Sequence, residues 1–223
     1  GKSAWNIMGK TADNAYLLQK GWKEMVDPLD PSNMIIYKDI NPADYNLNNP
    51  SFSQDYNINM SGGNDRGNYY AGLGYNRQEG LPISTFYERY SFVLNANYKI
   101  TDWLTSTSKF NYNRANWKNM PGSNGSEGNY FGRIMSTPPT ARFEDEDGNP
   151  TLGPNVADGN QAFQPEKWQN FNQTDKFTMI QGFQIDIMKG LFIKGTANWY
   201  YSEGLYESFT KDYMDNMLTE HYT

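Results

Sequence analysis

The chain has 223 residues, of which 37% are hydrophobic and 16% aromatic, and no helical stripe in it is apolar enough to build a large core. The net charge of −6 argues against nucleic acid as a partner, because nucleic acid rewards basic surfaces. The absence of cysteine excludes a disulfide framework, a thiolate zinc site and a cysteine nucleophile. No run of about 18 apolar residues exists, so a membrane-spanning helix is excluded as well.

Residues 1–52 are expected to form a loop region with one short helix. The pattern predicts that helix between Thr11 and Val26, with Leu18 and Trp22 on its apolar face. Gly21 inside it costs about 1 kcal/mol relative to alanine. Residues 27–50 are dense in Pro, Asn and Asp and predict a loop. We expect the helix to serve packing rather than binding.

Six segments of alternating residues follow, and they predict six antiparallel strands within residues 53–201. Period-two alternation is the strand signature, because successive side chains leave opposite faces of the pleat. One face is rich in Asn, Ser, Thr and Gly, and the other is apolar and ends in tyrosines. That combination is typical of a strand with lipid on one side and water on the other. The expected strands cover residues 54–63, 68–78, 89–99, 104–113, 176–187 and 191–201.

Short and long connections alternate between these strands. In outer-membrane barrels the short turns face the periplasm and the long loops face outside. The longest loop is expected to cover residues 114–174, and residues 202–223 are expected to begin a further extracellular loop. The first, third and fifth strands would therefore run inward.

Aromatic residues near the strand ends predict the two girdles of a transmembrane barrel. The residues predicted to face lipid or to form the girdles are Tyr69, Leu73, Tyr75, Tyr90, Phe92, Leu94, Tyr98, Trp103, Phe110, Tyr112, Trp199 and Tyr201. Lys109 and Lys194 fall on the polar parity, as this interpretation requires. Ser106, Ser108 and Gln181 fall on the lipid parity and do not fit it.

The predicted fold class is all-β: an antiparallel transmembrane β-barrel segment of about six strands from a larger barrel, with long extracellular loops. Six strands do not close a barrel, since the smallest transmembrane barrels need about eight, and an open sheet edge is not viable in lipid. The chain also lacks a start methionine and a signal peptide. We therefore expect it to be part of a longer protein.

The first two hairpins resemble the barrel of SusC-like (RagA-like) TonB-dependent transporters, the glycan and peptide importers of Bacteroidetes outer membranes. The first hairpin matches a strand ending in SGG followed by a strand of the form YxxxGYxxxxG. The second matches a strand opened by Arg and followed by a TDWL turn. The matching residues are Ser61, Gly62, Gly63, Tyr70, Gly74, Tyr75 and Gly80, then Arg89, Asn95, Tyr98, Thr101, Asp102, Trp103 and Leu104. The resemblance is strong over residues 53–113, weaker to 201, and absent from 1–50.

This resemblance implies a barrel of about 22 strands with a plugged lumen, located in the cell outer membrane. The family imports glycans or peptides that it captures with a SusD-like surface lipoprotein, and TonB supplies energy through the plug. The resemblance brings no cofactor and no metal. The plug domain itself is not part of this sequence.

The long loop supplies the candidate ligand-binding residues Trp117, Tyr130, Phe131 and Trp168. Flat aromatic rings beside amide side chains suit sugars or peptide backbones. The alternative is that they pack the loop onto the barrel mouth or against the partner lipoprotein. The acidic segment 144–147 predicts a hairpin turn rather than a calcium site, because the downstream ligands of a calcium loop are missing. No paired nucleophile and base is present, so we expect no catalytic residues and no enzyme.

An alternative from another class is a soluble β-rich carbohydrate-binding or adhesion module. Such a module would bury the apolar face against a second sheet. It would also tolerate the three polar residues on that face more easily.

Overall fold

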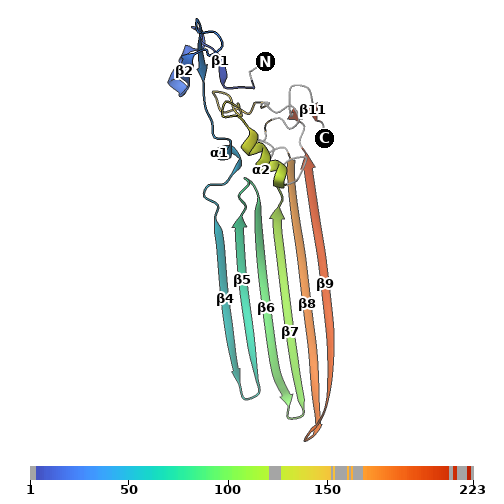
Figure 1. The fold of residues 1–223 in the computed structure, drawn as a ribbon. Helices are drawn as coiled ribbons and strands as arrows, with labels where there is room; N and C mark the ends of the chain where they lie inside the picture. The colour runs from blue at the N-terminus through green and yellow to red at the C-terminus, as the bar shows by residue number, and fades with distance from the viewer. Residues whose placement is uncertain are drawn as a thin grey trace.

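The computed structural model describes residues 4–120, 127–151, 153, 160, 162, 168–210, 213–214 and 220–221. Six long strands lie side by side, and the short elements gather at one end of them (Figure 1). The long sheet is antiparallel and open, with strand order β4-β5-β6-β7-β8-β9, so each strand pairs with its neighbour in sequence. The all-β class and the six-stranded antiparallel segment are therefore confirmed.

The strands of the long sheet lengthen along the chain. Their bounds are β4 Ser53–Asn64, β5 Gly67–Glu79, β6 Phe86–Thr101, β7 Leu104–Lys118, β8 Trp168–Met188 and β9 Leu191–Thr210. The pairing is in continuous register except for irregularities at Lys99/Thr101 and at Asp186/Met188. Both irregularities lie next to the short turns, where a bulge increases local twist.

Three tight turns close one end of the sheet, opposite the short elements (Figure 1). In the turn before β5, the Asn64 side chain accepts hydrogen bonds from the backbone N–H groups of Arg66 and Gly67. The turn before β9 contains Gly190 at φ +87°, a conformation that favours glycine. The predicted alternation of short and long connections is present, because the segment 80–85 and the β7–β8 loop lie at the other end.

The strands extend beyond the ends that the sequence predicts. β7 continues to Lys118, β8 begins at Trp168 and β9 continues to Thr210. These three strands are therefore longer than the expected boundaries at 114, 174 and 201 allow. The physical reason is that the apolar side chains of the alternating pattern are replaced by charged and polar ones, while the strand itself continues. Beyond Tyr112 the apolar parity carries charged residues, but the backbone ladder continues through the pairs Arg114–Asp175 and Asp175–Glu203.

The N-terminal region contains strands that the sequence does not predict. β1 (Ile7–Gly9), β2 (Lys23–Val26) and β3 (Met34–Tyr37) form a three-stranded sheet in the order β1-β3-β2. The expected helix is reduced to the 3₁₀ helix η1 (Ala15–Lys20), which ends where Gly21 adopts φ +85°. A glycine in that conformation terminates a helix. Leu17, Trp22 and Ile36 form the buried core of this small sheet.

Two short helices complete the described structure. α1 (Pro42–Asn46) begins at an Asn41 cap, whose side chain accepts a hydrogen bond from the backbone N–H of Ala43. α2 (Glu127–Ser136) lies near α1 at the same end of the long sheet (Figure 1). A further pair, β10 (Tyr213–Met214) and β11 (Glu220–His221), is antiparallel. Among the described residues, no helix is both long and apolar enough to span a membrane.

Residues 4–52 and 127–151 pack together, and we call them the loop module. The backbone N–H of Asn6 donates to the Thr140 carbonyl at 2.7 Å, and the N–H of Ile40 donates to the Pro139 carbonyl at 2.7 Å. The Asn6 side chain also donates to the Ala141 carbonyl at 3.0 Å. Backbone pairing therefore joins two segments about a hundred residues apart in sequence.

Candidate functional site

The two faces of the long sheet have opposite chemistry. The apolar face presents one residue from each strand in successive cross-strand rows. Its middle row is Met60, Ala71, Leu94, Phe110, Met179 and Trp199, and the next row is Ile58, Leu73, Phe92, Tyr112, Phe177 and Tyr201. Many of these side chains are exposed, including Ile58 at 71% and Trp199 at 69%. An apolar patch of this extent marks an interaction surface.

The residues predicted to face lipid or to form the girdles all lie on the apolar face or at its turn end. Tyr69, Tyr98 and Trp103 lie toward the short turns, whereas Tyr75, Tyr90 and Tyr112 lie toward the loop module. Aromatic rings pack along these rows: Phe92 contacts Phe110 at a centroid distance of 5.4 Å, and Phe110 contacts Phe177 at 5.0 Å.

Charged residues mark where the apolar face ends. Arg114 Nε donates to Asp175 Oδ1 at 2.7 Å, and the Tyr112 hydroxyl donates to the same oxygen at 2.6 Å. One row further, Glu88 accepts a hydrogen bond from the Tyr75 hydroxyl at 2.8 Å. From Leu104 to Tyr112, the apolar stretch of β7 spans about 26 Å along the strand at ~3.3 Å per residue. At a tilt of about 40° that is a height of about 20 Å, and the flanking girdles extend it toward the ~25 Å of a lipid band.

Ser106, Ser108 and Gln181 do lie on the apolar face, and they satisfy one another. Ser108 Oγ donates to Gln181 Oε1 at 2.6 Å, and Gln181 Nε2 donates to Ser106 Oγ at 2.9 Å. Gln181 also donates to the Gly182 carbonyl at 3.2 Å. A polar group away from water is costly only when it lacks a partner. These residues are therefore compatible with an apolar surrounding.

This polar trio leads to a prediction about the full-length protein. Replacing only the two serines (S106A together with S108A) should destabilise the fold by roughly 1–3 kcal/mol, because the Gln181 amide loses its side-chain partners. Adding Q181L should restore most of that loss, since all three polar groups are then gone. Urea unfolding in lipid vesicles, followed by tryptophan fluorescence, measures both variants. Equal stability of the double and triple variants would contradict the prediction.

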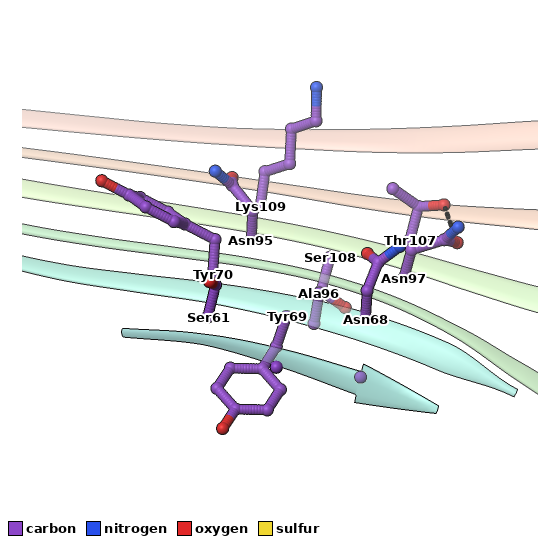
Figure 2. Close-up of a pocket in the computed structure, with 12 residues that line it drawn as sticks. Ser61, Asn68, Tyr69, Tyr70, Asn95, Ala96, Asn97, Thr107, Ser108 and Lys109 are labelled. Carbon is purple, nitrogen blue, oxygen red and sulfur yellow. Dashed lines mark hydrogen bonds between the residues drawn. The ribbon is translucent and has the colours of Figure 1, made fainter. Parts of the chain in front are cut away.

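The opposite, polar face contains a hollow of about 530 Å³ near the short-turn end. Figure 2 shows Tyr70, Asn95, Asn97, Thr107 and Lys109 on one side of the sheet, while Tyr69 points to the other. Thr107 Oγ1 donates to Asn97 Oδ1 at 3.1 Å, and the Tyr70 hydroxyl donates to Asn59 Oδ1 at 2.8 Å. The hollow is lined by amides, hydroxyls and one ammonium group together with Gly62, Gly63, Tyr69 and Ala96.

The candidate ligand-binding aromatics do not gather in one place. Trp117 lies on the polar-face parity, in a row with Tyr87 and Asn172 at the loop end of the sheet. The backbone of Trp168 begins β8 and pairs with Thr210, and its side chain lies outside the described part. The sequence gives no signal that would have separated these two positions.

Tyr130 and Phe131 lie in the loop module. Tyr130 is only 4% exposed, and its ring contacts Phe131 edge-on at a centroid distance of 5.8 Å. The Tyr130 hydroxyl donates to the Asn46 carbonyl at 2.8 Å. Burial raises the pKa of Tyr130, so the phenol remains a donor. In this structure Tyr130 packs loops together, which was the alternative to ligand contact.

The Asn46 carbonyl accepts hydrogen bonds from two other segments of the chain, which the sequence did not predict. It accepts hydrogen bonds from the Tyr130 hydroxyl and, at 3.0 Å, from the backbone N–H of Ile83. Asn46 is fully buried, and the next residue, Leu47, pairs with Pro82. Three connections therefore meet at one residue: the segment before β4, the β5–β6 loop and α2. Nothing in the sequence around Asn46 signals this contact.

A second polar contact joins the same segments. The Tyr45 hydroxyl donates to Glu144 Oε1 at 3.0 Å, and the Tyr45 ring packs edge-on against Phe143. Burial, followed by the hydrogen bond to Glu144, raises the pKa of Tyr45 to about 12. The phenol therefore stays protonated, and so able to donate, throughout the physiological pH range.

The acidic segment forms a hairpin turn, as the sequence favours. Asp145 Oδ1 accepts hydrogen bonds from the backbone N–H groups of Asp147 and Asn149, both at 2.9 Å. Gly148 adopts φ +81° in the turn, and Glu144 pairs with Pro150 across it. The carboxylate of Asp145 thus serves the local turn. Within the described residues, no cluster of His, Asp or Glu has the arrangement of a metal site.

Comparison with known proteins bears on the fold. No protein-family model and no curated protein sequence matches the chain. A solved structure described as the RagAB peptide transporter is similar, with a TM-score of 0.61 over 77% of this chain. The two share a fold. The sequence identity is 21%, and the chain spans about a fifth of the transporter chain it matches (20%).

Proposed function

We propose that the chain is part of the wall of an outer-membrane β-barrel transporter that imports peptides or glycans. The observation that carries the proposal is the division of one continuous sheet into an apolar and a polar face. The apolar rows end in tyrosines and then in ion pairs, which is how a barrel wall meets lipid and then water. The likeness to the RagAB peptide transporter supports the same class.

In this proposal the loop module lies outside the cell and the short turns lie in the periplasm. The polar face then lines the lumen, opposite a plug domain elsewhere in the full-length protein. TonB acts on that plug, and a SusD-like lipoprotein covers the loop end and captures the cargo with it. Backbone pairing between the loops gives such a lipoprotein an ordered surface.

The soluble alternative requires a second sheet over the apolar face. Among the described residues, the other sheets are the small β1-β3-β2 and β10-β11 sheets, and many side chains of the apolar rows stay exposed. The exposed apolar face favours the barrel.

Fractionation and heat modifiability of the full-length protein test the proposal. We expect it in the outer-membrane fraction, migrating faster on gels before boiling than after it, as folded barrels do. A surface lipoprotein should co-purify with it in mild detergent. Recovery in the soluble fraction, with a cooperative melt of residues 1–223 expressed alone, would show instead a soluble module.

A further inference from the structure

Lysine side chains occur at regular intervals along the polar face. Lys176 lies on β8, Lys109 on β7 is paired with Ile180, and Lys194 on β9 is paired with Gln184. Lys176, Lys109 and Lys194 therefore lie in the cross-strand rows of β8 residues 176, 180 and 184. At ~3.3 Å per residue the lysines follow one another every 13 Å or so, each on a different one of three adjacent strands.

Lys109 and Lys176 have no acidic neighbour in the sheet. The residues paired with Lys109 are Asn95 and Ile180, and those paired with Lys176 are Asn113 and Ser202. No hydrogen bond or ion pair within the described part of the chain involves either ammonium group. Lys194 differs, because Asp186 lies diagonally from it, although that carboxylate accepts a hydrogen bond from Gln184 at 2.9 Å.

The sign of this surface is opposite to that of the whole chain. The polar face of the long sheet carries the cations Arg89, Lys99, Lys109, Lys176 and Lys194 against the carboxylates Asp55 and Asp186. The chain as a whole has a net charge of −6. Cations spaced along a lumen wall attract anions and raise their local concentration, as basic residues do in anion-selective pores.

We propose that the polar face favours cargo that carries carboxylate groups. This inference rests on the proposed function, because it requires the polar face to line the path of the cargo. Lys176 is the first of the three lysines from the loop end, and Lys109 stands at the hollow of Figure 2. A carboxylate passes from one ammonium group to the next, while amides and hydroxyls between them hold water and hydrogen-bond the neutral parts of the cargo. Acidic peptides and acidic glycans share this chemistry.

Binding to the full-length protein, measured by calorimetry in detergent, tests the inference. The probes are an Asp/Ser decapeptide, an Asn/Ser decapeptide of equal length, and a galacturonate decamer. We expect wild type to bind an acidic probe at least about tenfold more tightly than the neutral peptide, the order expected from a few water-screened charge contacts. The two acidic probes distinguish a peptide from a glycan as the source of the carboxylate.

Two matched double variants locate the effect. The double variant K109Q/K176Q should lose most of the preference for the acidic probe. In this variant about 0.5 M salt should also weaken binding of the acidic probe much less than it does in wild type. The double variant K118Q/K189Q also removes two positive charges, but from outside the polar face. It should keep both the preference for the acidic probe and the weakening of binding by salt. Equal binding of acidic and neutral probes by wild type would overturn the inference. An unchanged preference in the first double variant would overturn it too.

An alternative role for Lys109 and Lys176, contact with the plug domain, predicts a different result. If these lysines serve only to hold a plug, K109Q with K176Q will lower the melting temperature and change the affinity for all probes alike, which overturns the inference. The gel assay of the barrel separates this from failure of the proposed function. A protein that inserts in the outer membrane but shows no acidic preference contradicts only the cargo inference.

Discussion

Leu94→Arg should lower the free energy of unfolding of the full-length protein in lipid vesicles by roughly 2–4 kcal/mol. Leu94 lies in the middle row of the apolar face, between Ala71 and Phe110. In the proposed barrel a guanidinium placed there would meet hydrocarbon, and it would lie too far from the charged rows to reach water easily. This is the largest effect that we expect from a single residue of the sheet.

The adjacent residue provides the control. Val93 lies on the polar face between Gly72 and Asn111. This face lines the lumen in the proposed barrel, and lumen-facing positions tolerate charge, so Val93→Arg should cost no more than about 1 kcal/mol. Leu94→Met tests the change of shape without charge. Urea titrations in vesicles report all three variants. If the two arginine variants were equally stable, the assignment of the apolar face to lipid would fail.

Tyr130→Ala should unfold the loop module without unfolding the sheet. Truncating a buried aromatic side chain costs about 3–5 kcal/mol, and the Asn46 carbonyl also loses a donor. Hydrogen exchange measured by mass spectrometry should show faster exchange in residues 34–48 and 127–145. Exchange in β5 to β8 should be unchanged, because the ladder of the long sheet does not involve Tyr130.

A milder variant separates the ring from the hydroxyl. Tyr130→Phe keeps the packing against Phe131 and removes only the hydrogen bond, so its cost should be about 1 kcal/mol. Exchange in the loop module should then rise only slightly. Rapid exchange that spread into β6 and β7 in the alanine variant would show that the loops and the sheet form one cooperative unit, contrary to our expectation.

The sheet was predictable because its signal repeats along each strand. Residues from Tyr56 to Tyr112 alternate between two chemically different surfaces, and this fixes both the strand and its faces. The strand ends were not predictable, because beyond Tyr112 both faces carry mostly polar side chains. Alternation then disappears from the sequence while the backbone pairing persists.

The loop module was less accessible to sequence reasoning. Its small sheet consists of short strands, and β1 pairs with β3, which lies about 25 residues further along the chain. The contacts of Asn46 and Asn6 involve partners far along the chain, and long-range pairing of single residues leaves no periodic signal. Tyr130 packs the loops together because its side chain is buried. That the residue is aromatic does not by itself predict whether it is buried or exposed.

The shared contact at the Asn46 carbonyl restricts how these loops can be exchanged between related proteins. A chimaera that receives only residues 127–151 replaces Tyr130, and one that receives only residues 80–85 can displace the backbone N–H of Ile83, so in either case the buried Asn46 carbonyl loses one of its two donors. Residues 4–52, 80–85 and 127–151 therefore need to be transferred together. Three stretches that are separate in the sequence therefore act as one unit in such an exchange.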